Sequence, residues 1–497
     1  MHSLARLDHQ FVWHPFTQMQ EWLKREPIVI VSGEGTVLRD VRGREYLDAN
    51  ASIWTNLHGH NHPKINGAIT RQLKKIAHSS ALGLANEPAS MLAAKLASLA
   101  NAPAPQSEDT FVKQSKPRKT GSSVPTLGKV FYSDDGSTAV EVALKLAYEF
   151  ARRTGQSPRP KFLSLEGAYH GDTVGAVSLG HIDLFHKRFS GLLFRTDRVM
   201  APYCYRCPFN RAKPERGDAR SYRQCALECV GQVAERFERQ RKAGKPYAAF
   251  VVEPLIQGAA GMIAQPRGWL QQVSEIVREN GAQLIADEVM TGFGRTGVGK
   301  LTGETVLNPP IFACQHENVR PDFMALAKGL TGGYLPMAAT LTTEPVFDAF
   351  LGDYESFKTF FHGHSYTANQ LGAAAALASI QVLQSPASIR ARRRLEAELS
   401  SALSRLWEFP NVGDVRQVGL IAGIELVRDW RTRQPFELRE RAGQKVCEAM
   451  ARRGVLTRPI GNVVVLMPPY CTTTRQLRQM VSALRDGLEE VFGVKKI

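Results

Sequence analysis

The sequence predicts an α/β protein built around a large mixed sheet that helices cover on both faces. From about residue 128 onward, short apolar runs of strand length alternate with helical patterns of roughly 10–20 residues, which is typical of sheets with parallel strands. The two ends of the chain lack this alternation, and no internal repeat is visible. Five of the apolar runs read as strands of one sheet: 129–133, 161–165, 248–253, 283–287 and 323–327.

The ends of the chain predict a second, smaller domain. Residues 28–48 read as a β-meander with turns at 32–33 and 42–43, and the C-terminal part mixes long helices with short strands at 421–426 and 463–467. A length of 497 residues favours about two to three domains. We therefore expect a large domain over 76–350 and an α+β domain built from 1–75 and 351–497. Residues 101–128, rich in Pro, Ser, Lys and Thr, read as a loop insertion, and 301–318 lacks clear periodicity.

Composition excludes several classes of protein. Apolar residues make up 43% and charged residues 22%, which argues against a disordered or fibrous chain. No apolar run is long enough for a membrane helix, and the N-terminus lacks the apolar core of a secretory signal, so we expect a cytoplasmic protein. The net charge of +16 would suit a nucleic-acid partner. The basic residues are scattered, however, and the densest run, 390–394, reads as a solvated helix face.

The segment after the first strand has the features of a phosphate-binding turn. A helix is expected to begin near Ser137, with Thr138 and Glu141 at the spacing of a capping box. Gly136 lets the backbone approach a ligand closely, and the N–H groups at the start of a helix attract an anion. The same residues also suit an ordinary helix cap with no ligand.

Two charged residues stand at the ends of later apolar strands. Asp287 ends the run 283–287, where strands of α/β sheets line the ligand crevice, although it could instead form a structural ion pair with Arg295. Lys328 follows the run 323–327, where burial would lower its pKa and make the amine nucleophilic, although a surface lysine is the alternative. A phosphate cradle, a carboxylate and a buried lysine are together what pyridoxal phosphate requires.

Over nearly its whole length the chain resembles the class III pyridoxal-phosphate aminotransferases. Three segments are strong markers of that class: Tyr169-His-Gly-Asp172, Asp287-Glu-Val289 with Thr291-Gly-Phe-Gly-Arg-Thr-Gly297, and Lys328-Gly-Leu-Thr-Gly-Gly333. Within the class, the chain is similar to the adenosylmethionine–8-amino-7-oxononanoate aminotransferases of biotin synthesis. Four segments indicate this narrower group: Trp13-His-Pro-Phe-Thr17, His58-Gly-His-Asn-His-Pro63, Arg458-Pro459 and Leu466-Met-Pro-Pro-Tyr470.

The resemblance implies an aspartate-aminotransferase-like fold and a homodimer with shared active sites. It also implies a ping-pong reaction in which S-adenosylmethionine, or lysine in a variant, gives its amino group to 8-amino-7-oxononanoate to form 7,8-diaminononanoate. Two alternatives stay open. One is another ω-aminotransferase that acts on 4-aminobutyrate, ornithine or a diamine. The other is a nucleic-acid-binding or regulatory protein that keeps the fold without catalysis.

The resemblance also assigns roles to matching residues. Lys328 would bind the cofactor covalently and move the substrate proton, Asp287 would pair with the pyridine nitrogen, and Tyr169 would stack on the ring and touch substrate. The remaining residues divide into two groups. The phosphate contacts would be Gly136 and Ser137, together with His364 and Ser365 of the neighbouring subunit. The substrate contacts would be Phe16, Ile53, Tyr169, Gly363, Lys328 and, for the keto-acid carboxylate, Arg458.

Three positions depart from the family's usual pattern. Ile53 stands where the family often has the first Trp of a Trp-Trp pair, and Phe16 stands where Tyr is usual. His364 replaces a usual Pro. The first two changes affect the pocket for the amino donor, and the lost hydroxyl at position 16 would remove one hydrogen bond, worth about 0.5–1.5 kcal/mol.

Four of the seven cysteines form a cluster in the sequence. Cys204 and Cys207 are followed by Cys225 and Cys229, a spacing that approaches a four-thiolate zinc site or an iron–sulphur anchor. The alternative is a set of reduced thiols in a surface insertion. The second pair is Cys-x-x-x-Cys and not Cys-x-x-Cys, so no metal ligands are assigned from the sequence.

Overall fold

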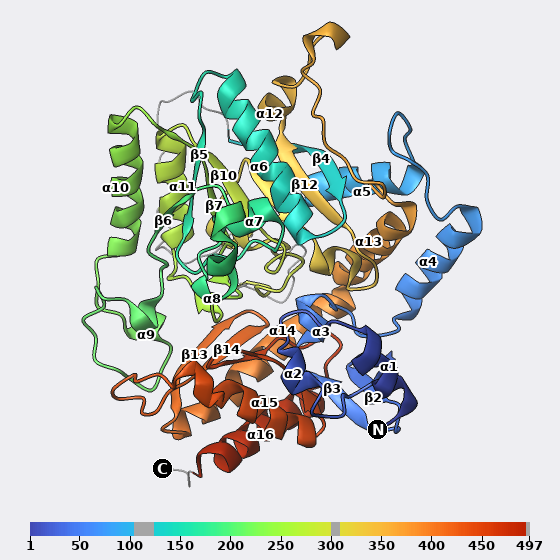
Figure 1. The fold of residues 1–497 in the computed structure, drawn as a ribbon, viewed down its shortest axis with the longest axis vertical. Helices are drawn as coiled ribbons and strands as arrows, with labels where there is room; N and C mark the ends of the chain where they lie inside the picture. Colours follow the sequence, from blue (N-terminus) through green and yellow to red (C-terminus); the bar gives the residue numbers. More distant parts are fainter. Residues whose placement is uncertain (104–123, 300–308, 494–497) are drawn as a thin grey trace.

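A seven-stranded sheet forms the centre of the protein in a computed structural model, which describes residues 1–103, 124–299 and 309–493 (Figure 1). The strand order is β4-β12-β11-β10-β7-β5-β6. β12 runs antiparallel to both of its neighbours, and the other paired strands are parallel, so the sheet is mixed. The strands are β4 (Leu127–Ser133), β5 (Lys161–Leu165), β6 (Asp197–Val199), β7 (Tyr247–Val252), β10 (Gln283–Asp287), β11 (Phe323–Leu326) and β12 (Ala338–Thr343).

Helices cover both faces of this sheet because side chains alternate along each strand. Phe162 and Val251 pack with α6 (Gly136–Arg153) and α7 (Val174–Leu179). Leu163 and Phe250, one position away on the same strands, pack with α10 (Glu228–Lys242) and α11 (Trp269–Glu279). Further helices around this domain are α4 (Pro63–Lys75), α5 (Glu87–Ala100), α8 (Asp183–His186), α9 (Ala219–Tyr222), α12 (Glu344–Asp348) and α13 (Gln370–Leu383).

Elements from both ends of the chain lie side by side in the lower part of Figure 1. One four-stranded sheet has the order β1-β2-β3-β15, in which Val455 of β15 pairs with Leu47 of β3. A second has the order β13-β14-β17-β16. The strands are β1 (Ile30–Glu34), β2 (Val37–Asp40), β3 (Glu45–Asp48), β13 (Val412–Val418), β14 (Ile421–Leu426), β15 (Val455–Leu456), β16 (Pro459–Ile460) and β17 (Val463–Leu466).

Helices complete this second region, and a short hairpin connects it to the large sheet. The helices are α1 (Ser3–Phe11), α2 (Met19–Trp22), α3 (Ala51–Trp54), α14 (Pro386–Leu403), α15 (Ala442–Arg452) and α16 (Thr474–Phe492), and the hairpin is β8 (Ile256–Gln257) with β9 (Ile263–Ala264). The predicted domain boundaries at 75/76 and 350/351 stay a prediction. No helix of the described residues is both long and apolar enough to cross a membrane.

Some local predictions needed correction. The meander at 28–48 forms as expected, but its first turn lies at Gly35, which has a φ of +55°, and Gly33 lies inside β1. Parts of the two expected irregular stretches, 101–128 and 301–318, lie outside the described residues, which omit 104–123 and 300–308. Within the second stretch, Ala313–Glu317 forms a short 3-10 helix, η3.

Candidate active site

Lys328 and Asp287 meet because the strands that carry them are neighbours. β10 and β11 pair in parallel, with Asp287 opposite Ala325, and Lys328 follows β11 by two residues. Lys328 opens the short helix η4 (Lys328–Thr331) with a φ of +42°, an unusual backbone conformation for a residue with a long side chain. The carboxyl ends of parallel strands are where ligands bind in α/β sheets, so both residues stand at the expected edge.

A buried histidine holds the Asp287 carboxylate. His170 Nδ1 lies 2.7 Å from Asp287 Oδ2, and the Val289 N–H donates to Asp287 Oδ1 at 3.1 Å. Burial alone would lower the pKa of His170, but the hydrogen bond and the charge of Asp287, with Glu253 nearby, raise it overall. The sequence alternative of an ion pair with Arg295 is wrong. The Arg295 guanidinium instead donates to the backbone oxygens of Pro468 and Asn56.

The environment of Lys328 favours its neutral amine. Burial lowers the pKa of Lys328, although the charges of Asp287 and Glu253 act in the opposite direction. Its Nζ lies 4.7 Å from the centroid of the Trp54 ring. Glu253 directly follows β7, and burial raises its pKa to about 7. A lysine with a lowered pKa is a better nucleophile at neutral pH.

The turn before α6 is a cradle of glycine and backbone N–H groups. A Cβ on Gly136 would lie 2.7 Å from a methyl carbon of Val289, and one on Gly171, where φ is +120°, would lie 2.0 Å from Ser137 Oγ. Both positions therefore require glycine. The capping box is not Thr138 with Glu141, as the spacing suggested. Asp135 is the N-cap and pairs with Thr138.

Glu141 has a different role, because its side chain reaches the next helix. Its Oε1 accepts hydrogen bonds from the backbone N–H groups of Gly175 at 2.7 Å and Ala176 at 3.3 Å, at the start of α7. The side chain of Asp135 accepts only from Thr138 N in the first turn of α6. The first N–H groups of a helix have no partner within the helix, so those of Gly136 and Ser137 suit a phosphate.

These residues fit pyridoxal phosphate on structural grounds. Gly136 has no room for a Cβ, and the backbone N–H groups of Gly136 and Ser137 suit the phosphate. The Asp287 carboxylate suits a protonated ring nitrogen, and Lys328 suits the aldehyde. Val289, which packs on Gly136, offers an apolar surface beside the carboxylate. This assignment of individual contacts stays a prediction from geometry.

A row of aromatic side chains includes Tyr169, the chain neighbour of His170. The Tyr169 ring stacks on His186, with centroids 6.2 Å apart, and meets Phe185 edge-on at 6.4 Å. Phe185 in turn contacts Phe16, with centroids 5.3 Å apart. The Tyr169 hydroxyl donates to Asp172 Oδ2 at 2.6 Å, and burial together with this bond raises the pKa of Tyr169. Two predicted substrate residues, Phe16 and Tyr169, therefore share one aromatic wall.

Residues 51–54 form a strained bend next to Lys328. Ala51, Ser52 and Trp54 all have positive φ angles, of 45°, 63° and 65°. The Trp54 indole N–H donates to Asn50 Oδ1 at 2.9 Å, which fixes the ring beside Lys328 Nζ. Ile53, the predicted pocket residue, is 47% exposed. Such strain is typical of functional sites, where the surrounding structure holds an unfavourable conformation.

Three of the other predicted site residues are exposed on the single chain, and the fourth, His364, is half-buried. Gly363, Ser365 and Arg458 are exposed, the last of them between β15 and β16. His364 Nδ1 lies 3.1 Å from Asp134 Oδ2, just before the phosphate cradle, and the Ser365 carbonyl accepts from His78. None of these three exposed residues is brought into the Lys328 cluster by a contact between described residues.

Sequence reasoning missed four residues of this site. His170 lay in a motif that was used only as a family marker, although a histidine between Tyr169 and Gly171 could have been considered as a carboxylate partner. Trp54 was noted only as the neighbour of Ile53. Glu253 ends a predicted strand, as Asp287 does, so strand-end position could have identified it. Phe185 had no sequence signal.

Comparisons with known proteins find relatives that match almost the entire chain. The family described as aminotransferase class-III matches residues 19–488. Adenosylmethionine-8-amino-7-oxononanoate aminotransferases are similar at 45% identity in Geobacter sulfurreducens, over 99% of this chain and 98% of that one, and at 40% identity in Aquifex aeolicus, over 98% of each.

Solved structures of aminotransferases are similar to this chain as well. The crystal structure of the enzyme of that name from Methanocaldococcus jannaschii has a TM-score of 0.84 at 37% identity and covers 98% of this chain and 99% of its own. An omega transaminase from Pseudomonas jessenii in complex with PMP has a TM-score of 0.84 at 25% identity, with 99% of each chain covered. The predicted fold class is confirmed. The chain belongs to the class-III aminotransferase family, which also confirms the predicted aminotransferase activity and its pyridoxal phosphate cofactor.

Proposed function

We propose that the enzyme transfers an amino group from S-adenosylmethionine to 8-amino-7-oxononanoate and forms 7,8-diaminononanoate for biotin synthesis. The observation that carries the proposal is the meeting of Lys328 and Asp287 at adjacent strand ends, beside the aromatic wall of Phe16, Phe185 and Tyr169. The names of the relatives at 40–45% identity support this acceptor. The ω-aminotransferase alternative has weaker support, because the omega transaminase of known structure shares 25% identity with this chain, less than the relatives named above.

Each residue has a defined task in this reaction. When bound, pyridoxal phosphate supplies an electron sink that makes the substrate Cα–H acidic. Lys328 Nζ, neutral more readily because burial lowers its pKa, takes that proton and returns it in both half-reactions. Asp287, held by His170, carries the negative charge that keeps a ring nitrogen protonated. The Arg458 guanidinium suits the carboxylate of the acceptor.

The donor proposal depends on the aromatic wall. Phe16 is 59% exposed and presents a ring face that can stack on an adenine. The missing hydroxyl at this position removes a polar contact but leaves the apolar surface in place. Lysine has no ring that could stack on this wall, so S-adenosylmethionine is the better match.

A half-reaction tests donor and acceptor separately. Enzyme loaded with pyridoxal phosphate is mixed with S-adenosylmethionine, L-lysine, 4-aminobutyrate or ornithine, and the loss of cofactor absorbance is followed. We expect only S-adenosylmethionine to convert the cofactor. Addition of 8-amino-7-oxononanoate should then restore the absorbance and yield 7,8-diaminononanoate by mass spectrometry. Conversion by lysine alone would reassign the donor, and failure of the acceptor step would overturn the proposal.

A homodimer is part of the proposal. Large apolar side chains are exposed in two stretches, 73–91 and 351–361, including Leu82 at 92%, Tyr354 at 86% and Phe361 at 74%. The second stretch follows α12 and projects from the body at the top of Figure 1. Contiguous apolar exposure marks interaction surfaces, and Gly363 and Ser365 lie just beyond it, where they would enter the partner's site.

Sedimentation of designed variants tests the dimer. Phe361→Asp places a charge in the proposed interface and should give monomers. Leu438→Asp, at a residue 57% exposed outside the two stretches, is the matched control and should remain dimeric. A monomeric native enzyme, or dissociation of both variants alike, would contradict the proposed interface.

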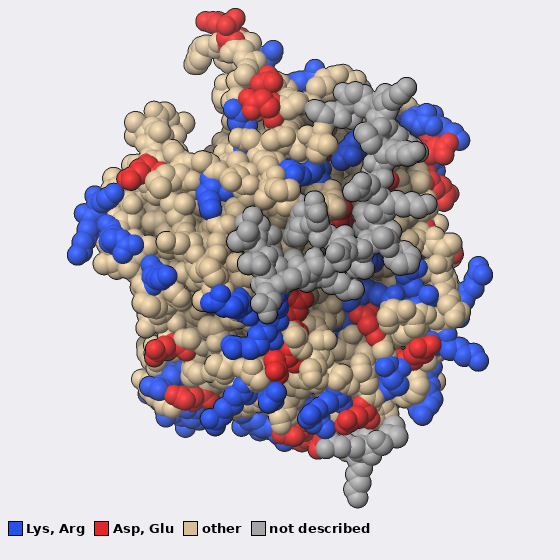
Figure 2. Space-filling view, turned by 180° about the vertical axis from the view of Figure 1, so that it is seen from behind, with Lys and Arg blue, Asp and Glu red and all other residues tan. Residues whose placement is uncertain are grey.

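The face of the molecule in Figure 2 gives little support to a nucleic-acid-binding role. Figure 2 shows Lys and Arg side chains lying among Asp and Glu side chains and not in one continuous basic track. Nucleic-acid binding that depends on phosphate contacts would need such a track. A cytoplasmic location stays a prediction from the sequence.

A further inference from the structure

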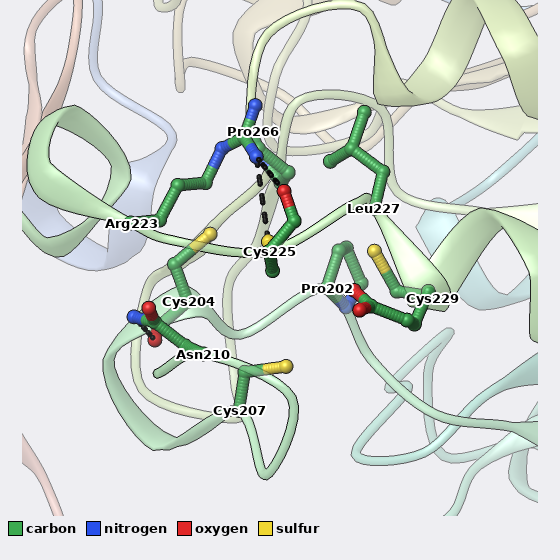
Figure 3. Close-up of a pocket in the computed structure, with 10 residues that line it drawn as sticks. Pro202, Cys204, Cys207, Asn210, Arg223, Cys225, Leu227, Cys229 and Pro266 are labelled. Atoms are coloured by element: carbon green, nitrogen blue, oxygen red, sulfur yellow. Dashed lines mark hydrogen bonds between the residues drawn. The ribbon is translucent and has the colours of Figure 1, made fainter. Parts of the chain in front are cut away.

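Four cysteines that the transamination chemistry does not use surround one small cavity. Cys204 is the first residue of the short helix η2 (Cys204–Arg206) and Cys207 directly follows it, Cys225 precedes Leu227, and Cys229 lies in the first turn of α10. All four line a cavity of about 10 Å³, and Figure 3 shows their side chains around the same space from different sides. A cavity of this volume holds about one water molecule, or one metal ion of similar size.

The backbone is strained where it brings the second pair together. Leu227, between Cys225 and Cys229, has a φ of +61°, and no side chain caps α10 at this residue. A bulky residue in this left-handed conformation costs free energy. The strained turn places both thiols, and the Leu227 side chain, on the wall of the same cavity.

A cation stands next to the thiols. Arg223 Nη1 donates to Cys225 Sγ at 3.3 Å and lies 3.5 Å from the Cys225 carbonyl oxygen. Four thiolates around a divalent cation leave a net charge of minus two, because each thiol that binds releases its proton. A guanidinium in this position would partly neutralise that charge, which helps in a poorly hydrated site.

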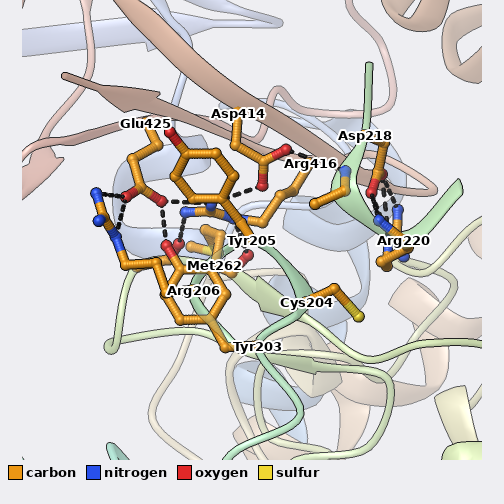
Figure 4. A network of polar contacts seen from close by, with 12 residues as sticks. Tyr203, Cys204, Tyr205, Arg206, Asp218, Arg220, Met262, Asp414, Arg416 and Glu425 are labelled. Atoms are coloured by element: carbon orange, nitrogen blue, oxygen red, sulfur yellow. Dashed lines mark hydrogen bonds and ion pairs between the residues drawn. The ribbon is translucent and has the colours of Figure 1, made fainter. Parts of the chain in front are cut away.

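The segment that carries the first pair is fixed to the C-terminal sheet. Arg206 Nε donates to Glu425 Oε1 at 2.7 Å, and the Tyr203 hydroxyl also donates to Glu425. Arg416, fully buried on β13, donates to Glu425 at 2.6 Å and to Asp414 at 2.9 Å. Figure 4 shows this network beside Cys204. A metal ion bound by both cysteine pairs would therefore link α10, which packs on the large sheet, to β13 and β14.

We propose that Cys204, Cys207, Cys225 and Cys229 bind one Zn²⁺ as a closed structural site. Four sulphur ligands in tetrahedral geometry suit zinc or an iron–sulphur cluster, and the cavity of about 10 Å³ has room for one ion only. A site with four protein ligands has no open position for a substrate. The zinc would hold the segment 202–229 in place.

The side chains must turn to bind the ion. All seven cysteines are free thiols, and among the described residues no three metal-binding side chains are yet close enough together to hold a metal. Rotation of a cysteine between staggered χ1 positions moves its sulphur while the backbone stays in place. Binding of the ion therefore includes a rotation of the cysteine side chains, and the inference is independent of the proposed transamination.

Metal content of the purified holoenzyme tests the site. We expect one zinc per chain by plasma mass spectrometry, and a loss of about tenfold or more in Cys225→Ser and Cys229→Ser. Cys447→Ser is the matched control, because Cys447 and Cys229 are each 6% exposed, and it should keep its zinc. Equal zinc in Cys229→Ser and Cys447→Ser would overturn the proposal.

A second measurement serves if the cysteine variants do not fold. Native enzyme is titrated with a mercurial thiol reagent in the presence of a chromophoric zinc chelator, and zinc release should follow the modification of four thiols. Enzyme purified from cells grown with Co²⁺ should show the visible absorption of tetrahedral cobalt thiolate at wavelengths longer than those of the cofactor bands. An enzyme that contains no zinc and takes up none, a disulfide within the cluster, or iron with sulphide would each refute a zinc site.

Discussion

Replacement of His170 by leucine should slow the chemistry without changing any residue that is expected to touch substrate. His170 Nδ1 lies 2.7 Å from Asp287 Oδ2, and both side chains are almost fully buried. In His170→Leu the carboxylate loses the donor that stabilises its charged form, so it holds a ring nitrogen protonated less well. His170→Asn is the matched control, since its amide N–H can donate from nearly the same place as Nδ1.

The structure sets the expected magnitude. A hydrogen bond to a charged group contributes about 1.5–3 kcal/mol, which corresponds to a loss of roughly 10- to 150-fold in the rate of the half-reaction. Removal of one partner from a buried charged pair should also lower the free energy of unfolding by about 3–5 kcal/mol. His170→Asn should recover most of the rate because it restores a donor, and less of the stability because its amide carries no charge.

Stopped-flow absorbance with S-adenosylmethionine and thermal unfolding across pH check this reasoning. The pKa of folded His170 is raised, so the charged pair contributes fully below about pH 6.5, the ordinary histidine value. That contribution should be lost as the pH rises through the raised folded-state pKa. A leucine variant as fast as the native enzyme, or an asparagine variant as slow as leucine, would refute the role of the pair.

Three further predictions concern other residues of the site. Lys328→Ala should abolish turnover while circular dichroism and sedimentation stay unchanged; appreciable activity would contradict the role of the amine. Arg458→Ala should raise KM for the keto acid more than for the donor, and equal increases would argue against a carboxylate contact. Burial raises the pKa of Glu253 to about 7, so its ionised form is disfavoured in the folded protein. Glu253→Gln should therefore gain stability relative to the native enzyme, by up to about 3 kcal/mol, as the pH rises from about 4.5 to 7, and thermal unfolding with no such trend would exclude this effect.

The strands could be predicted from sequence where apolar runs are bounded by turns. The five predicted strands agree with β4, β5, β7, β10 and β11 to within two residues. β12 was not predicted, because its sequence Ala-Ala-Thr-Leu-Thr-Thr has a single bulky apolar residue, Leu341, and no apolar run that marks a strand. Its reversed direction is set by neighbours on both sides, which no local pattern in the sequence encodes.

Site residues were predictable when their chemistry depends on strand position. Asp287 ends one apolar strand and Lys328 follows another, so each could be identified from its own segment of the sequence. The partners of these residues depend on packing between distant segments: His170 is 117 positions from Asp287, and Trp54 reaches Lys328 from the N-terminal region. The helix cap was misassigned because Asp135 and Thr138 offer the same spacing as Thr138 and Glu141.

The pairing of β3 with β15 has a consequence for protein synthesis. Leu47 leaves the ribosome first, and its partner Val455, 408 residues further along the sequence, emerges much later. Until then β3 is an open edge that can recruit strands from other nascent chains. Overexpression should therefore favour aggregates of unfinished chains, and a chaperone that covers this edge during elongation should increase the yield.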